Sequence, residues 1–265
     1  MIARRVSILV AAFASLAVTG RASALDAFEI QVYDSDINDP GQFGVELHSN
    51  YTVHGDAVSG GPGLIAPNRA GHLTLETALG VTDWLELGAY LQAADAPGTG
   101  ARFGGTKLRT KFVLPERAGL APLRLGLNVE LGWVPRLVEQ EGWAIELRPI
   151  IGWSNGIVLV DVNPIVGFTL DGSDRFRPGM EPCAKASYNT RLGFALGLEY
   201  YAGLGFMNEV LPLRDQEHLL FAAFDLVEPP GQPASKWELN VGVGEGLTHG
   251  TGQDVLVKAI MGRTF

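Results

Sequence analysis

Apolar and polar residues alternate along most of the chain beyond residue 42. The segment from 123 to 133 shows this most clearly, since every second residue is apolar: Leu123, Leu125, Leu127, Val129, Leu131 and Trp133. Successive side chains of a β-strand point to opposite faces, whereas a helix would repeat every 3.6 residues. The pattern therefore predicts β-strands with one apolar face and one polar face.

About twelve segments carry this alternation or a weaker form of it. They lie near 43–53, 72–79, 85–92, 107–112, 123–133, 143–152, 157–170, 182–188, 192–204, 218–227, 237–244 and 255–265. Pro149 and Pro164 fall inside two of them. Because proline cannot donate a ladder hydrogen bond, we expect bulges or rim positions there.

The connections between these segments alternate in length. Three are short turns, at 81–83, 154–156 and 189–191, whereas those at 54–71, 93–105 and 205–217 are long. Short turns at one rim and long loops at the other are typical of outer-membrane barrels. The sequence therefore predicts an all-β fold, a transmembrane up-and-down antiparallel β-barrel, over residues 42–265.

Aromatic residues near the strand ends favour a membrane barrel over a soluble sandwich. Trp84, Trp143 and Trp237 are positioned to form interfacial girdles. The last strand alternates toward a terminal aromatic residue, Phe265, and we interpret that ending as the assembly signal of bacterial barrels. The expected partners are the barrel-assembly machinery and outer-membrane lipid.

The N-terminus has the features of a secretory signal. Two arginines precede an apolar run that ends in a small-x-small motif at 22–24. We therefore expect a signal peptide over 1–24, export to the bacterial outer membrane, and an N-terminal segment over 25–41 that is periplasmic or plugs the barrel. The formal net charge of −9 disfavours binding to nucleic acid, and the single cysteine excludes an intrachain disulfide.

Four stretches carry a resemblance to a known group of proteins. They are residues 29–34, 40–44, 80–88 and 199–205, and the third begins with Gly-Val-Thr-Asp, a common periplasmic hairpin motif. In these stretches the chain resembles proteobacterial outer-membrane barrels grouped with the MetA pathway of phenol degradation. The resemblance implies a barrel that moves small organic molecules, and it identifies no functional residue.

Enzymatic motifs are incomplete in this sequence. Outer-membrane lipid hydrolases place a histidine two positions before a serine, but position 152, before Ser154, is glycine. His48 and Ser49 are adjacent and would therefore face opposite sides of a strand. At the rim, His218 with Asp215 or His249 with Asp254 could form a protease-like couple. We predict that the protein is not an enzyme and has no cofactor.

Metal ligands are also not expected, because no two of the five histidines have ligand spacing. His48 and His72 would lie on adjacent strands facing the lumen, where a hydrogen bond is the favoured interpretation.

The polar face of the predicted strands carries charges of both signs. Lys107, Arg109 and Lys111 would form a basic ladder along one strand, with acidic partners on neighbouring strands. The candidate lumen residues are Glu46, His48, His72, Glu76, Glu86, Lys107, Arg109, Lys111, Arg124, Glu130, Glu146, Arg148 and Glu199.

Two functions fit such a face. The charges could line a narrow channel or transporter for small, possibly organic, solutes. Alternatively, they could fill and stiffen a closed structural barrel without transport. A lipid-modifying hydrolase is a third, weaker alternative.

Overall fold

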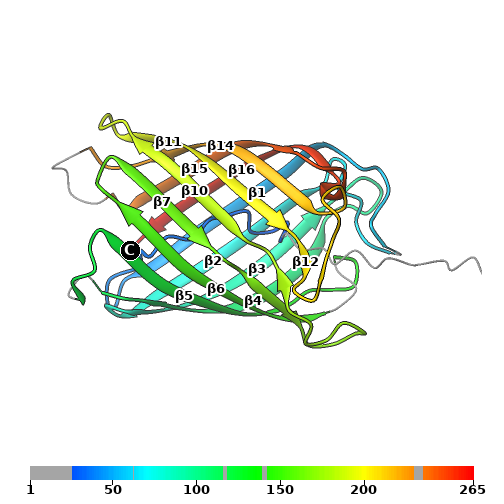
Figure 1. The fold of residues 1–265 in the computed structure, drawn as a ribbon, viewed down its shortest axis with the longest axis horizontal. Coiled ribbons are helices and arrows are strands. Elements are labelled where there is room, and N and C mark those ends of the chain that lie inside the picture. The colour runs from blue at the N-terminus through cyan, green and yellow to red at the C-terminus, as the bar shows by residue number, and fades with distance from the viewer. Residues whose placement is uncertain (1–25, 62, 116–117, 139–141, 230–234) are drawn as a thin grey trace, which may run out of the picture.

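The computed structural model describes residues 26–61, 63–115, 118–138, 142–229 and 235–265. These residues form an antiparallel β-barrel that is drawn with its strands inclined to the long axis (Figure 1). The first six strands are β1 (Phe43–Gly55), β2 (Gly71–Thr82), β3 (Leu85–Asp95), β4 (Arg102–Val113), β5 (Leu123–Trp133) and β6 (Trp143–Ser154). Each pairs with the next along the chain.

The second half of the barrel contains shorter elements. These are β7 (Val158–Asn163), β8 (Val166–Thr169), β9 (Gly179–Met180), β10 (Cys183–Asn189), β11 (Phe194–Gly203), β12 (Gly205–Phe206), β13 (Glu209–Val210), β14 (Glu217–Leu226), β15 (Trp237–Gly246) and β16 (Gln253–Thr264). A short 3-10 turn, His249–Thr251, precedes β16. No helix in the described ranges is long and apolar enough to cross a membrane.

The barrel closes where the last strand meets the first. β16 pairs with β1 over nearly the full length of both strands, from Gly44 opposite Thr264 to Gly55 opposite Gln253. β7 with β8, β9 with β10, and β11 with β12 are consecutive parts of single barrel strands, and β13 is a two-residue strand paired with β12 at the edge of the sheet. The described residues therefore form twelve barrel strands. This confirms the predicted up-and-down barrel.

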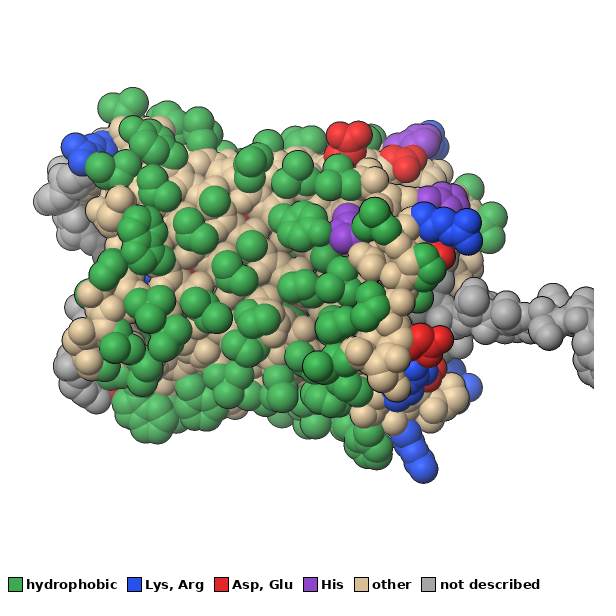
Figure 2. All heavy atoms as spheres, in the orientation of Figure 1, with side chains coloured by type: hydrophobic (Ala, Val, Ile, Leu, Met, Phe, Trp, Pro, Cys, Tyr) green, Lys and Arg blue, Asp and Glu red, His purple; other side chains and the backbone are tan. Residues whose placement is uncertain are grey.

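The outer face of the barrel is apolar. Leu47, Leu108 and Leu198 are 40%, 63% and 57% exposed, as expected for side chains that face lipid. Figure 2 shows hydrophobic side chains over the middle of the barrel, while the visible charged side chains gather toward its ends. Trp84, 41% exposed, stacks on Phe112 with ring centroids 6.2 Å apart. The pattern is that of a transmembrane barrel.

The predicted strand over 157–170 is interrupted in the structure. β7 ends at Asn163 and β8 begins at Val166, so Pro164 lies between two strands. On this side of β6, Leu147 pairs with Val166 of β8, and the next paired residue is Ile151, opposite Val162 of β7. Among the described residues, those of β6 between them have no ladder partner on this side. Pro149 lies in this skipped stretch, and because it has no N–H, no ladder donor is lost there. The expectation of irregularity at both prolines is confirmed, whereas the prediction of a single unbroken strand over 157–170 was wrong.

Two predicted loops also contain strand structure. β9 lies in the expected loop at 171–181, and β12 and β13 lie in the expected loop at 205–217. β9, β12 and β13 are each only two residues long, so none of them leaves a periodic signal in the sequence.

Candidate functional site: the barrel lumen

The N-terminal segment, residues 26–41, lies inside the barrel (Figure 1). Phe28, Ile30 and Tyr33 are 2%, 6% and 3% exposed. The segment contains no helix or strand, so its backbone must find hydrogen-bond partners elsewhere. The predicted signal peptide, 1–24, and residue 25 lie outside the described residues.

Side chains of the wall bond to the backbone of the segment. The Asn163 side chain accepts from the Tyr33 N–H at 2.7 Å and donates to the Tyr33 carbonyl at 2.9 Å. Lys258 Nζ donates to the Ile30 carbonyl at 2.9 Å, and Arg148 Nη1 donates to the Gln31 carbonyl at 3.1 Å. These side chains replace the ladder partners that a strand would have.

The C-terminal end of the segment, which leads into β1, is also bonded to the wall. The backbone N–H and the side-chain amide of Asn38 both donate to Glu86 Oε2 at 2.7 Å. Lys111 Nζ donates to the Asp36 carbonyl at 2.6 Å. A Cβ on Gly80 would lie 2.2 Å from the Asn38 carbonyl oxygen, so only glycine allows the segment to pass this close to the wall.

The basic ladder of β4 faces inward, in the register that the alternation predicts. Lys107 Nζ contacts Asp26, and lies 3.2 Å from Glu29 and 2.9 Å from Glu130. Asp26 and Glu29 belong to the N-terminal segment, so Lys107 joins that segment to β5. Sequence reasoning predicted acidic partners on neighbouring strands but did not predict partners from the segment.

Arg109 lies at the centre of the buried network. Its Nη2 atom is 2.7 Å from Glu76 Oε1 and 2.8 Å from Glu86 Oε1, and its side chain is only 5% exposed. The guanidinium also lies 5.6 Å from the ring centroid of Tyr33. One cation thus holds two buried carboxylates, an arrangement that is costly to break.

The other predicted lumen residues make separate contacts around the wall. Arg148 pairs with Glu146 at 2.7 Å and lies over the Tyr33 ring at 4.3 Å. Arg124 reaches Asp36 of the segment at 3.1 Å.

Two more of the predicted residues lie on other strands. Glu199 contacts Lys258 and lies 3.4 Å from Lys185, and His72 packs edge-on against Phe28 at 4.8 Å. Much of the predicted set therefore contacts the N-terminal segment directly, and the rest pairs with other residues of the wall.

Sequence reasoning missed the segment's own contribution to the site. Phe28, Ile30 and Val32 alternate before the first barrel strand, and this apolar alternation was the available signal. Asn163 was also missed, because its role depends on the break in the strand.

Burial affects the ionisation of Glu29, which belongs to the segment and not to a strand. Desolvation and the nearby Glu130 carboxylate raise its pKa to about 7, against the opposing effect of Lys107. A carboxyl with a raised pKa favours the folded state below its ordinary pKa, and this contribution is lost as the pH rises toward 7. The contacts of Glu29 with Lys107 are therefore sensitive to pH near neutrality.

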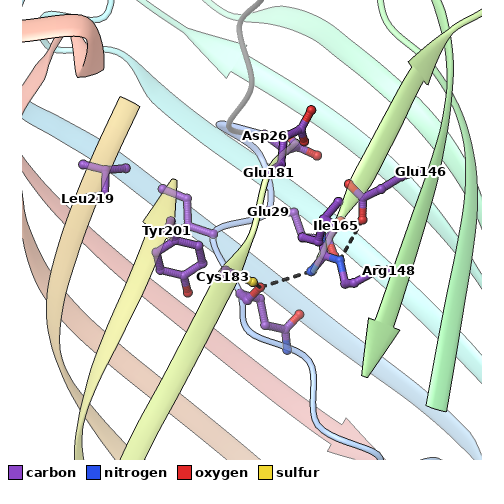
Figure 3. Close-up of a pocket in the computed structure, with 11 residues that line it drawn as sticks. Asp26, Glu29, Glu146, Arg148, Ile165, Glu181, Cys183, Tyr201 and Leu219 are labelled. Atoms are coloured by element: carbon purple, nitrogen blue, oxygen red, sulfur yellow. Dashed lines mark hydrogen bonds and ion pairs between the residues drawn. The ribbon is translucent and has the colours of Figure 1, made fainter. Parts of the chain in front are cut away.

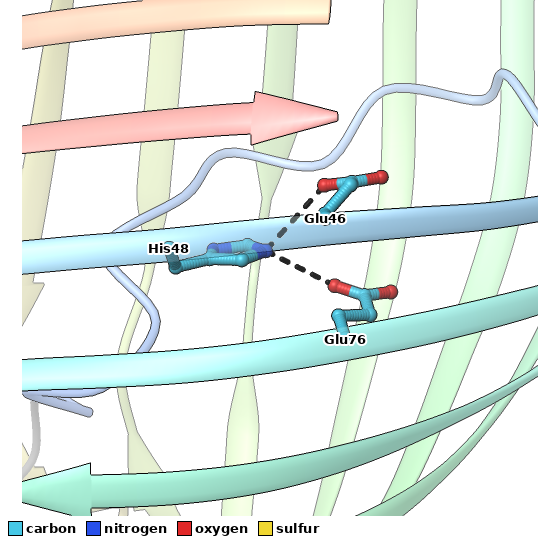
Figure 4. Close-up of side chains that lie close together, drawn as sticks. All are labelled: Glu46, His48 and Glu76. Atoms are coloured by element: carbon cyan, nitrogen blue, oxygen red, sulfur yellow. Dashed lines mark hydrogen bonds and ion pairs between the residues drawn. The ribbon is translucent and has the colours of Figure 1, made fainter. Parts of the chain in front are cut away.

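Glu46, His48 and Glu76 come together on β1 and β2 (Figure 4). His48 Nε2 lies 3.4 Å from Glu46 Oε2 and 3.2 Å from Glu76 Oε2. Spacing between histidines along the chain gives no sign of this group. It cannot reveal the group because Glu76 comes from the neighbouring strand.

The candidate catalytic pairs do not form. His48 is buried in the lumen, whereas Ser49 is the next residue on β1 and so faces the other side. Ser154 Oγ accepts from the Gly156 N–H in a turn. Asp254 lies 2.5 Å from His54, instead of forming the proposed couple with His249.

A small cavity of about 20 Å³, enough for a water molecule, lies between the N-terminal segment and the interrupted part of the wall (Figure 3). Ile30, Ile165 and Leu219 supply apolar surface, and Glu146 and Arg148 supply an ion pair. The cavity therefore has both apolar and charged sides.

A closed barrel with an apolar outer band and a charged lumen defines a transmembrane protein of the outer-membrane β-barrel class. Comparison with solved structures agrees. The COG4313 outer membrane channel from Pseudomonas putida F1 is similar with a TM-score of 0.62 and 17% identity, over 89% of this chain and 100% of that one.

Two porins are also similar. The KdgM porin has a TM-score of 0.54 at 10% identity, covering 84% of this chain and 99% of its own. The NanC porin has a TM-score of 0.53 at 8% identity, covering 84% and 98%. At these identities the likeness establishes the fold, which is the one that the resemblance in the sequence implied. No protein-family model and no curated protein matches the chain.

Proposed function

We propose that the protein is an outer-membrane channel for small solutes, closed in this structure by its N-terminal segment. The observation that carries the proposal is the content of the lumen. Side chains fill the interior of an eight-stranded barrel, but a twelve-stranded barrel is wider. Here the remaining space holds residues 26–41 and a cavity, and not wall side chains alone.

The way in which the segment is held supports a removable plug. It has no regular secondary structure, and its bonds run to side chains such as Asn163, Lys258 and Lys111. Such bonds can be replaced by water when the segment leaves, whereas the barrel ladder stays intact. A displaced segment would expose a lumen lined by Lys107, Arg109 and other charged residues.

The solute class follows from the cavity and from the related structures. The cavity is water-sized while the segment is in place, but its apolar surface and its ion pair would line the lumen once the segment leaves, and such a lining suits a small organic molecule that carries a polar group. The names of the similar structures, a channel and two porins, support passage of solutes.

Absence of catalysis and assembly through Phe265 remain predictions. Phe265 is 58% exposed, and its N–H donates to the Phe43 carbonyl at 2.9 Å.

Liposome swelling tests this function directly. Vesicles containing the mature chain should admit small neutral and aromatic organic solutes faster than empty vesicles, and a variant lacking residues 26–36 should admit them faster still. If vesicles containing the mature chain and vesicles containing the shortened variant both swell no faster than empty vesicles, the protein is a closed structural barrel. Release of fatty acid from the vesicle lipid would favour the hydrolase alternative.

A further inference from the structure

Three carboxylates share one row across the place where the last strands of the barrel meet the first ones. Glu46 on β1 lies directly opposite Glu76 on β2. On the other side of Glu46 the row continues through Gly262 on β16 to Glu238 on β15. A Cβ on Gly262 would lie 2.9 Å from Glu46 Cγ and 3.3 Å from Glu238 Cβ, so nothing bulky separates the two acids. Like charges in directly opposed positions are destabilising.

The nearest basic side chain balances only part of this row. Arg109 Nη2 contacts Glu76 Oε1 at 2.7 Å but is shared with Glu86 at 2.8 Å. Among the described residues, Glu46 Oε2 is buried and has no hydrogen-bond partner. The row therefore has a negative site between Glu46 and Glu76 that Arg109 does not reach.

The contacts of His48 are longer than those of an ordinary imidazolium–carboxylate pair. Nε2 lies 3.2 Å from Glu76 Oε2 and 3.4 Å from Glu46 Oε2, whereas charge-assisted hydrogen bonds measure about 2.7–2.9 Å. One N–H shared between both oxygens would make a three-centre hydrogen bond in which neither contact is short. All three atoms lie within 4.8 Å of one another, and the His48 side chain is 1% exposed.

These distances match the edges of a tetrahedral metal site. Zinc binds histidine nitrogen at about 2.0–2.1 Å and carboxylate oxygen at about 2.0–2.2 Å, so neighbouring ligand atoms lie roughly 3.3–3.5 Å apart. The two measured nitrogen–oxygen distances lie at or near that range.

We propose that Glu46 Oε2, His48 Nε2 and Glu76 Oε2 bind one divalent cation of the zinc type. The fourth position would take water from the lumen, because the Glu46 side chain is 24% exposed while the other two are buried. Arg109 holds the second oxygen of Glu76 and so orients the ligating carboxylate, as outer partners of metal ligands commonly do. The cation would balance the charges of Glu46 and Glu76 and would link β1 to β2.

The proposal reverses the expectation from histidine spacing and is independent of channel activity. It predicts that the mature chain, refolded in a zwitterionic detergent without lipopolysaccharide, binds one equivalent of Zn²⁺ in titration calorimetry. Co²⁺ in place of Zn²⁺ should give the visible absorption of a tetrahedral site. Glu46→Gln removes a direct ligand, so it should weaken the binding of either metal by more than the about 10–100-fold that loss of an outer partner causes. His48→Gln should abolish binding.

His72→Gln and His54→Gln are matched controls, one in the lumen and one at the surface beside Asp254, and should bind like the unaltered chain. The folded state of every variant is checked by its heat-modifiable mobility, and Glu46→Gln carries the test if His48→Gln does not fold. Absence of stoichiometric binding, unchanged binding by Glu46→Gln, or loss of binding in His54→Gln would each overturn the proposal.

Discussion

The barrel wall is continuous from β1 to β5 but interrupted from β6 to β12. β2 pairs with β3 from Gly71 to Thr82 with one register shift. β6 pairs with two separate strands, first with β8 over Ala144–Leu147 and then with β7 over Ile151–Ser154. The continuous wall carries the basic ladder, whereas the interrupted wall borders the cavity.

The N-terminal segment interacts differently with the two walls. On the continuous side its partners include the charged side chains of Lys107 and Glu86. On the interrupted side Asn163 bonds the Tyr33 backbone in both directions. The Asn163 side chain, at the end of β7, thus takes the place of a strand partner for Tyr33. In the proposed channel, the continuous wall would hold most of the charges and the interrupted wall would face the solute.

Arg109→Met should have the largest effect on stability. It leaves Glu76 and Glu86 buried without their shared cation, and breaking such a network costs about 3–5 kcal/mol. Urea unfolding of the refolded barrel in lipid vesicles measures the loss. Arg263→Met, which removes a charge that lies over the Trp237 and Phe265 rings, is the control and should cost less than about 1 kcal/mol. Equal losses would remove the distinction between lumen and rim charges.

Leu108→Arg should be the next most disruptive change. Leu108 lies between Lys107 and Arg109 in mid-β4 and faces lipid, where arginine costs about 2–4 kcal/mol. Leu123→Arg, at the end of β5, should cost about 0–1 kcal/mol. The same unfolding measurement compares them, and a tolerated Leu108→Arg would show that the register of the continuous wall is wrong.

Asn163→Leu should weaken the hold of the interrupted wall on the segment. It removes both bonds to Tyr33 and leaves two buried backbone groups without partners, at about 1–3 kcal/mol for each group. We expect faster proteolysis of the segment in vesicles, while the barrel itself stays protected. Asn189→Ala, at the end of β10 where the side chain accepts from the Arg191 N–H, is the control. Unchanged proteolysis would mean that Asn163 does not hold the segment.

Cys183 should report the smallest change, a difference in labelling rate. The thiol is 2% exposed and lines the cavity beside the segment. A membrane-impermeant maleimide should react slowly with the unaltered chain and faster with Asn163→Leu. Fast labelling of both proteins would show that the segment does not shield the cavity.

The sequence predicted the continuous wall better than the interrupted one. Strict alternation in β4 and β5 determines which side chains face the lumen, so the inward positions of Lys107, Arg109 and Glu130 followed from period two alone. The break at Asn163 leaves only a proline as its signal. The position of residues 26–41 depends on tertiary contacts to many strands, which no local pattern encodes.

The Glu46, His48 and Glu76 group illustrates the same limit. Glu46 and His48 are visible as neighbours on one face of a strand. Glu76 joins them only through the cross-strand register of β1 and β2, in which it lies opposite Glu46. Pairwise spacing along the chain cannot reveal such a group, whereas an explicit register can.

Planar-bilayer conductance tests the central claim, that a solute channel is closed by the N-terminal segment. The mature chain should show small or rare conductance steps, and the variant lacking residues 26–36 should show larger and longer-lived ones. Both proteins are first confirmed as folded by heat-modifiable mobility. Conductance that is absent from both folded proteins, or identical in the two, would contradict the account.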